Sequence, residues 1–137
     1  MGSHRLIGGN TQLQQFADFQ QALTNAASIF CRRQAEDVKH LVTELEEVVT
    51  MDPKRPEDDV IIAPGGTQKF AKYHKDKKTW TRKVENYTSN KSTMCSMLLG
   101  QCDFAMHAML EMIEDWESNT SNLLFVLKAA HWCSGEL

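Results

Sequence analysis

The sequence predicts an all-α protein, a compact bundle of about five helices with one long acidic loop that contains Pro and Gly. Apolar residues recur at steps of three and four along most of the 137-residue chain, which is the helical period. Pro is confined to one short stretch. Hydrophobic residues make up 42% and charged residues 24%, as in ordinary globular domains.

The length predicts one domain. We expect a single helical domain over residues 11–133, preceded by a vector remnant or flexible N-terminus at 1–10 and followed by a short tail at 134–137.

The first helix is predicted by an apolar stripe from Leu13 to Phe30, with Thr11 as its N-cap. A second stripe runs from Val38 to Val49. The two stripes fit either one long helix or two. We favour a break at residues 31–34, where the stripe is interrupted, although this segment holds neither Gly nor Pro.

Residues 51–66 form the predicted loop. Three prolines remove backbone donors, Gly65 and Gly66 add backbone freedom, and acidic side chains keep the segment in water. A connection of this length inside a domain is usually functional or mobile.

Three further helices are predicted after the loop. One begins at Thr67 and can continue to Leu98, with Gly100 as a bend or stop. The next runs from Cys102 to about Glu114. The last begins near Asn119, capped by Asn119 or Ser118, and buries the apolar residues Leu123, Leu124, Val126, Leu127 and Ala130.

Charge is unevenly distributed along the chain. Residues 36–59 carry nine acidic and three basic residues, whereas residues 67–91 carry eight basic and two acidic ones. The basic segment fits a nucleic-acid contact, with Tyr73 and Trp80 nearby for stacking. We favour the alternative, a solvated face that pairs with the acidic second helix, within a subunit or between neighbours. The acidic half would repel a phosphate backbone, and the formal net charge of −3 disfavours general nucleic-acid binding. The residues concerned are Lys69, Lys72, Lys75, Lys77, Lys78, Arg82 and Lys83.

The sequence offers no strong signal for a reaction centre. Asp103, His107, Glu111 and Glu114 share a helix face, but this face lies opposite the apolar residues and is expected to meet water. A zinc site from Cys95, Cys102, His131 and Cys133 would need distant segments to converge, and a Cys133–His131 nucleophile pair lacks an orienting group. We therefore expect that the protein is not an enzyme and that it binds no metal, cofactor or small-molecule substrate.

Location is predicted from what the sequence lacks. No apolar run approaches the roughly 20 residues of a membrane helix, and the N-terminus has no apolar signal segment. The four cysteines are expected to be reduced, mostly buried thiols. We expect a cytoplasmic protein without a membrane partner.

An ordered set of residues between 76 and 132 carries a family resemblance. It consists of Trp80, Asn90-Lys91, the run from Leu98 to Cys102, Leu110-Glu111 and the run from Leu123 to Leu127. The segment resembles the central part of Gag proteins from copia-class retrotransposons. The resemblance implies a capsid-like helical domain. The zinc knuckle with which many Gag proteins hold RNA is absent from this sequence, so RNA is expected to be at most a weak partner.

Two function classes follow. The first is a structural Gag capsid-like domain that self-associates into a shell-like assembly. The second is a helical adaptor that binds a peptide or helix in an apolar groove. Methionine clusters are more often core than a binding groove, but aromatic and Met side chains also anchor interfaces. The residues predicted to make assembly or partner contacts are Trp80, Tyr87, Met106, Met109, Trp116 and Trp132.

Overall fold

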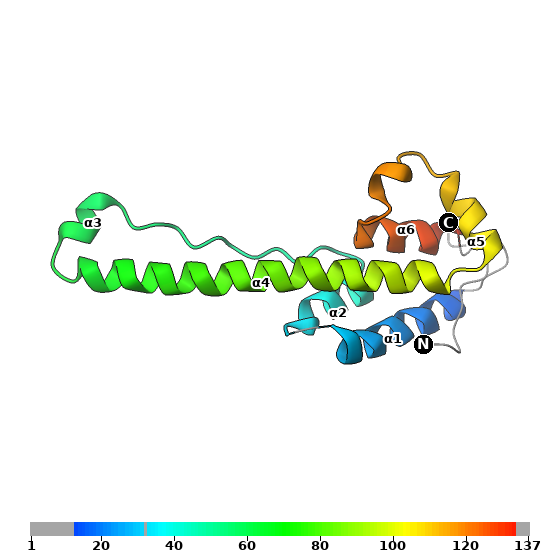
Figure 1. The fold of residues 1–137 in the computed structure, drawn as a ribbon, viewed down its shortest axis with the longest axis horizontal. Helices are drawn as coiled ribbons and strands as arrows, with labels where there is room; N and C mark the ends of the chain where they lie inside the picture. Colours follow the sequence, from blue (N-terminus) through cyan, green and yellow to red (C-terminus); the bar gives the residue numbers. More distant parts are fainter. Residues whose placement is uncertain (1–12, 32, 134–137) are drawn as a thin grey trace. The chain divides into compact units, whose positions relative to one another are not determined.

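The structure is a computed structural model that describes residues 13–31 and 33–133. Within these residues it contains six α-helices, one 3-10 helix and no strand, so the predicted all-α class is confirmed (Figure 1). The helices are α1 (Leu13–Phe30), α2 (Ala35–Glu44), α3 (Asp58–Ile62), α4 (Gly66–Gln101), α5 (Phe104–Glu111), the 3-10 helix η1 (Glu117–Asn119) and α6 (Leu123–Cys133). None of the described helices is both long and apolar enough to cross a membrane.

The chain divides into two compact units where the sequence analysis expects one domain over 11–133. We call residues 1–48 and 87–137 the core unit, of which 13–31, 33–48 and 87–133 are described. Residues 49–86 form the hairpin unit. Helix α4 contributes residues to both units, because the division falls between Asn86 and Tyr87.

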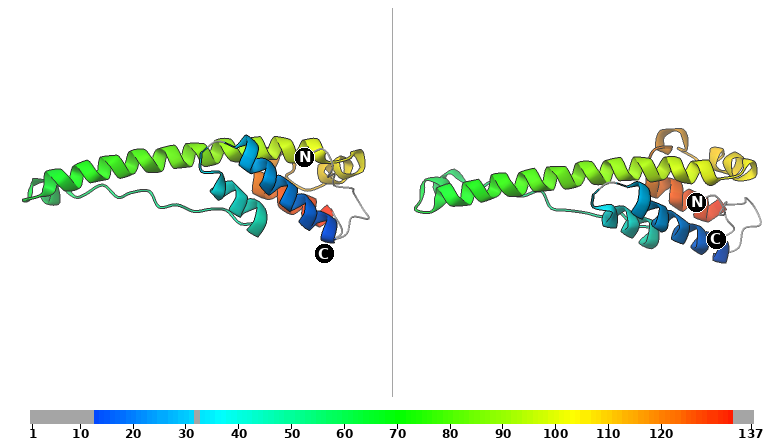
Figure 2. Two further views of the ribbon diagram at one scale, coloured as in Figure 1. Left: turned by 90° about the horizontal axis from the view of Figure 1, so that it is seen from below. Right: turned by 60° about the horizontal axis from the view of Figure 1, so that its bottom comes forward.

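The core unit is built from α1, α2, the last four turns of α4, α5 and α6 (Figures 1 and 2). Helices α1 and α2 pack together, as do α5 and α6. The rings of Phe16 and His131 stack with their centroids 4.3 Å apart, which places α1 against α6. The largest fully buried side chains all belong to this unit: Phe16, Phe19, Leu23, Val38, Leu41, Met94, Leu98, Met106, Leu110, Leu123 and Leu127.

The predicted break between the first two stripes is confirmed, and the first stripe, from Leu13 to Phe30, lies on α1. Gln34 adopts the left-handed conformation, with φ of 67°, directly before α2. The Asn90 side chain from α4 donates to the Arg33 carbonyl at 3.4 Å, so a tertiary contact satisfies the turn. The predicted cap Thr11 lies outside the described residues.

Helix α2 ends at Glu44, although the apolar stripe continues to Val49. Leu45 is left-handed, with φ of 54°, and its N–H donates to the Leu41 carbonyl at 2.9 Å. A left-handed residue at this place is a common helix end, usually supplied by Gly. Because Leu stands there, the sequence carried no stop signal, and the predicted end of this helix was wrong.

The structure of the hairpin unit differs from the predicted loop over residues 51–66. Five residues of that stretch form α3, and α4 already begins at Gly66. Gly65 is left-handed, with φ of 81°. A Cβ atom on Gly66 would lie 2.0 Å from the Ile61 carbonyl oxygen, so only glycine allows the turn to pass this close to α3.

The remaining helices differ from the prediction mainly at their ends. Helix α4 passes through Gly100 and ends one residue later, so this glycine marks the stop rather than a bend. Asp103 caps α5 by accepting the Met106 N–H at 2.7 Å. Asn122 caps α6 by accepting the Phe125 N–H at 3.2 Å, in place of the predicted Asn119 or Ser118.

Candidate interaction surfaces

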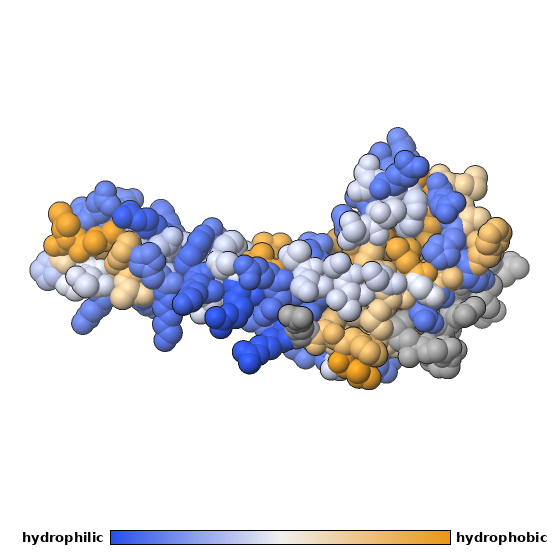
Figure 3. All heavy atoms as spheres, in the orientation of Figure 1, coloured by the Kyte–Doolittle hydropathy of each residue, from blue (hydrophilic) through white to orange (hydrophobic). Residues whose placement is uncertain are grey.

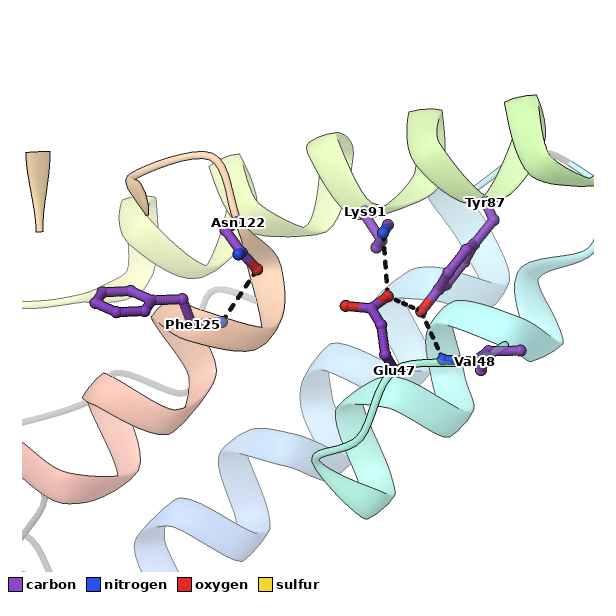
Figure 4. Close-up of polar contacts among 6 residues, drawn as sticks. All are labelled: Glu47, Val48, Tyr87, Lys91, Asn122 and Phe125. Carbon is purple, nitrogen blue, oxygen red and sulfur yellow. Dashed lines mark hydrogen bonds and ion pairs between the residues drawn. The ribbon is translucent and has the colours of Figure 1, made fainter. Parts of the chain in front are cut away.

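A polar cluster in the core unit fastens the segment that follows α2 to α4 (Figure 4). The Tyr87 hydroxyl accepts the Val48 N–H at 3.1 Å and donates to the Glu47 carboxylate, which also pairs with Lys91 at 3.0 Å. Burial and then the hydrogen bond to Glu47 raise the pKa of Tyr87 above its usual value. Tyr87, predicted as a partner contact, is thus a buried internal fastener.

The residues that carry the family resemblance in the core unit mostly build its fold. Asn90 is buried and reaches the α1–α2 turn, and Lys91 reaches Glu47. The apolar members Leu98, Leu110, Leu123 and Leu127 are all fully buried or nearly so. Glu111, the polar member of the set on α5, is exposed. These positions therefore bear on the fold more than on any binding surface.

The other predicted contact residues of the core unit fall into three environments. Met106 has no exposed surface and Trp116 is 8% exposed, so both pack inside the unit. Met109 is half-buried against the core. Trp132 on α6 is 62% exposed and is the predicted contact best placed to meet another molecule.

The outer face of α5 is an apolar stripe that the sequence analysis missed. Phe104 is 90% exposed at the first residue of α5, and Met112 is 86% exposed at its C-cap. Ala108 lies between them at four-residue steps and is also exposed, as is Ala105 beside it. Residues four apart share a helix face, so these side chains form one surface. Hydrophobic colour reaches the surface over α5 in Figure 3.

The composition of this segment carried a signal for the outer face. From Phe104 to Ile113 all residues except His107 and Glu111 are apolar. A short helix that is apolar on all sides needs partners on more than one side. The core unit buries only Met106 and Leu110 of α5 itself, which leaves the Phe104–Met112 side without a packed neighbour in the described chain.

The hairpin unit joins an extended segment, residues 49–57, to the first half of α4. We call this segment the strap. Thr50 accepts the Trp80 Nε1–H at 3.1 Å, Asp52 pairs with Lys77 at 2.6 Å, and the Arg55 guanidinium lies 5.4 Å from the centre of the Phe70 ring. An extended chain advances about 3 Å per residue and an α-helix about 1.5 Å. Five strap residues therefore match ten helix residues, and the two run antiparallel in step.

Trp80 is held within the hairpin unit. Besides its bond to Thr50, its ring lies 4.7 Å from the Lys77 ammonium group. Tyr73 is half-buried and packs near Phe70 and His74, with ring centroids 6.2 and 5.4 Å away. The two aromatic side chains predicted to stack on bases are therefore engaged on the side of α4 that meets the strap.

Most of the predicted cations lie on the opposite side of α4. At 100° per residue, five of them span about 140° of the helix circumference without an acidic residue among them. They are Lys72, Lys75, Lys78, Arg82 and Lys83. Lys69 lies just outside this arc, and Lys77 points toward the strap. We call the five residues the basic face; within the described chain none of them has an ion pair within 4 Å.

Two residues of the acidic stripe considered for metal binding, Asp103 and His107, make contacts within the fold. The Asp103 side chain caps α5, and His107 Nε2 lies 2.9 Å from the Leu99 carbonyl oxygen. No group of three or more potential metal ligands comes together in residues 13–31 and 33–133.

All four cysteines are free thiols. Cys95 donates to the Thr120 carbonyl at 3.2 Å. Burial, and then the nearby Asp103 charge, raise the pKa of Cys102 to about 12, so this thiol stays protonated at neutral pH. A protonated, partly buried thiol is a poor nucleophile, and the geometry suggests a structural role for it.

Two hollows in the described part of the core unit are lined mostly by polar residues. One of about 380 Å³ is lined mainly by polar side chains around the Glu47–Lys91 ion pair and the start of α6. A second, of about 400 Å³, lies over α2 between Thr24, Lys39 and His40. An adaptor that binds an apolar helix would need a lining of the opposite character.

In comparisons with known proteins, no protein family, no curated protein and no solved structure matches this chain.

Proposed function

We propose that this chain is a non-enzymatic structural domain, a Gag capsid-like unit that associates with copies of itself. The outer face of α5 is the observation that carries the proposal. It presents Phe104 and Met112 to solvent with Ala108 between them. Large exposed side chains that flank a small one let two helices approach closely and interdigitate.

The rest of the core unit supports an assembly role. Trp132 and Phe30 are exposed by 62% and 59%, on helices α6 and α1. Exposed aromatic side chains on different helices suit repeated weak contacts, as a shell requires. A capsid-like assembly needs more than one contact surface per subunit, because a single symmetric surface closes a dimer.

The resemblance of residues 76–132 to copia-class Gag proteins gives the proposal its family context. The core positions of that resemblance are buried here as the framework of a helical unit. A helical adaptor remains the alternative, but the two hollows described above give it less support than the α5 face gives self-association.

The test is the mass of the protein against concentration, measured by light scattering from low to high micromolar. We expect a mass that grows with concentration. The variant Phe104→Ser/Met112→Ser should shift this growth to at least about tenfold higher concentration, because both side chains are surface residues and lose only intermolecular contacts. The matched control is Met51→Ser/Ile62→Ser in the hairpin unit, where the side chains are 89% and 85% exposed.

The proposal fails if the unmodified protein stays monomeric throughout this range. If the control lost association to the same extent, the contact between copies would not depend specifically on the α5 face. A monomer that binds an amphipathic helical peptide would favour the adaptor.

A further inference from the structure

The hairpin and core units carry opposite charge. The hairpin unit holds nine basic and six acidic residues, a formal charge of +3. The sequence of the core unit holds six basic and twelve acidic residues, a formal charge of −6. The chain's net charge of −3 therefore conceals a locally cationic surface. The net charge of the whole chain does not disfavour a nucleic-acid contact on the hairpin unit.

The strap separates charge within the hairpin unit. It draws Lys77 to Asp52, and Arg55 pairs with Asp58 at 3.1 Å. Both pairs lie on the strap side of α4. The acidic residues of α4 in this unit, Asp76 and Glu85, fall at the two margins of the basic face at 100° per residue. The cations of the basic face are thus left to meet solvent or a partner.

The basic face also lacks what a protein partner would need. The residues between its cations are Gln68, Ala71, Thr79 and Asn86, so nothing apolar larger than alanine lies there. Protein–protein interfaces are depleted in Lys and centre on apolar or aromatic anchors. A repeated anion such as a phosphate backbone needs only regularly placed cations.

We propose that the basic face of α4 binds the phosphate backbone of a nucleic acid without regard to sequence. Lys72 and Lys83 are eleven residues apart, about 16 Å along the helix, which faces about five phosphates of one strand at 3.4 Å each. Base stacking plays no part, because Trp80 is held by Thr50 and Lys77 on the other side of the helix. This binding is separate from self-association through α5 and requires no zinc knuckle.

The experiment is fluorescence anisotropy of labelled single-stranded oligonucleotides, U20 RNA and T20 DNA, titrated with the full chain from 50 to 200 mM salt. With five cations in contact, the logarithm of the binding constant should fall against the logarithm of salt with a slope of about −3.5. This corresponds to about a hundredfold loss of affinity across that range. Oligonucleotides of other sequences should bind within about threefold.

The variant Lys75→Gln/Lys78→Gln/Arg82→Gln removes three of the five cations. Its slope should fall to about −1.4, with at least about tenfold weaker binding at the lowest salt. The matched control, Arg33→Gln/Lys39→Gln/Lys128→Gln, removes the same charge from the core unit and should keep the slope. Circular dichroism confirms that both are folded; the single variant Arg82→Gln, with an expected slope of about −2.8, serves if the triple variant is not.

Three results would overturn the proposal. The unmodified chain could fail to bind at 50 mM salt, or the control could weaken binding as much as the variant does. The variant could also lose salt-sensitive self-association while neither oligonucleotide binds. In that last case the basic face meets the acidic core unit of a second copy instead.

Discussion

Helix α4 is buried along one part and exposed along the other. In the core unit its residues Tyr87, Asn90, Met94, Cys95 and Leu98 are all at most 9% exposed. Between Gly66 and Asn86, where every residue is described, Gly66 alone is buried. The core unit is held together by apolar packing, whereas the hairpin unit is held by a strap with a few polar and aromatic contacts. Helical structure and tertiary stability are thus separable along one continuous element.

The largest expected difference between the units comes from truncating apolar side chains. Leu98→Ala removes a fully buried side chain from the α4 segment of the core unit and should cost about 2–5 kcal/mol of unfolding free energy. Ile62→Ala in the hairpin unit, where the side chain is 85% exposed, should cost less than about 0.5 kcal/mol. Urea denaturation followed by circular dichroism measures both. Similar costs at both positions would mean that the hairpin unit has a packed interior of its own.

A second test uses two glycines of α4, one in each unit. Gly66→Ala forces a Cβ atom against the Ile61 carbonyl oxygen and should cost about 1–3 kcal/mol, confined to the hairpin unit. Amide hydrogen exchange should become faster in residues 58–70 and stay unchanged in the core unit. Gly100→Ala meets open space within a helix and should stabilise the protein by about 0.5–1 kcal/mol. Faster exchange throughout the chain would show that the two units unfold together.

A third test removes the hydroxyl that fastens the segment after α2 to α4. Tyr87→Phe leaves the Val48 N–H and the Glu47 carboxylate without this partner and should cost about 1–2 kcal/mol. Thermal unfolding at pH 7 provides the measurement, with the exposed Thr88→Val on the same helix as a control. An unchanged melting temperature would mean that water replaces the hydroxyl.

The same tyrosine makes a pH prediction. Because the pKa of Tyr87 is raised in the folded state, its contribution is fully present below the ordinary value of about 10 and is lost as pH rises above it. Melting temperatures of the unmodified protein should therefore fall more steeply above pH 10 than those of Tyr87→Phe. Parallel curves for the two proteins would exclude Tyr87 as a source of alkaline destabilisation.

The smallest expected effect belongs to the strap. Asp52→Asn breaks the ion pair between Asp52 and Lys77, two side chains that are 52% and 38% exposed. The loss should cost less than about 1 kcal/mol of unfolding free energy. Lys54→Gln, a strap residue without an ion pair among the described residues, is the control. Hydrogen exchange across residues 66–80 measures the local effect. Because 1 M salt should screen the ion pair, the unmodified protein should exchange at that salt as fast as the variant does. A cost above 2 kcal/mol would make the strap a main support of the hairpin unit.

Helical periodicity predicted most helices but few of their ends. The apolar stripe from Leu13 to Phe30 coincides with α1, because the stripe is long and uninterrupted. The ends of α2 and α6 were missed where Leu45 adopts a left-handed conformation and where Asn122 supplies the cap. Helix α3 lies in a stretch that Pro, Gly and charge mark as loop, and it extends for only five residues. Short elements and unusual caps depend on contacts that a local pattern does not contain.

The sequence predicted the basic candidate surface on α4 but not the apolar one on α5. The basic residues of α4 were identified from charge alone, but their separation into Lys77 on the strap side and five cations on the other required the structure. The α5 face was missed because Phe104 and Met112 were not distinguished from the core positions beside them. Conversely, Tyr87, Met106 and Trp116 were predicted as contacts and are buried. An apolar residue shows that burial is favourable, not what will bury it.

Spacing of apolar side chains was enough to establish an all-helical chain, since backbone hydrogen bonding within a helix is local and needs no distant partner. Charge along the chain likewise revealed a basic segment after an acidic one. The tertiary structure decided which turns of α4 are packed, which side of α5 faces solvent, and which cations the strap neutralises. These are properties of pairs of residues far apart in sequence, such as Asp52 with Lys77 and Glu47 with Tyr87. Such pairs form only when the chain folds back on itself, and no local pattern specifies them.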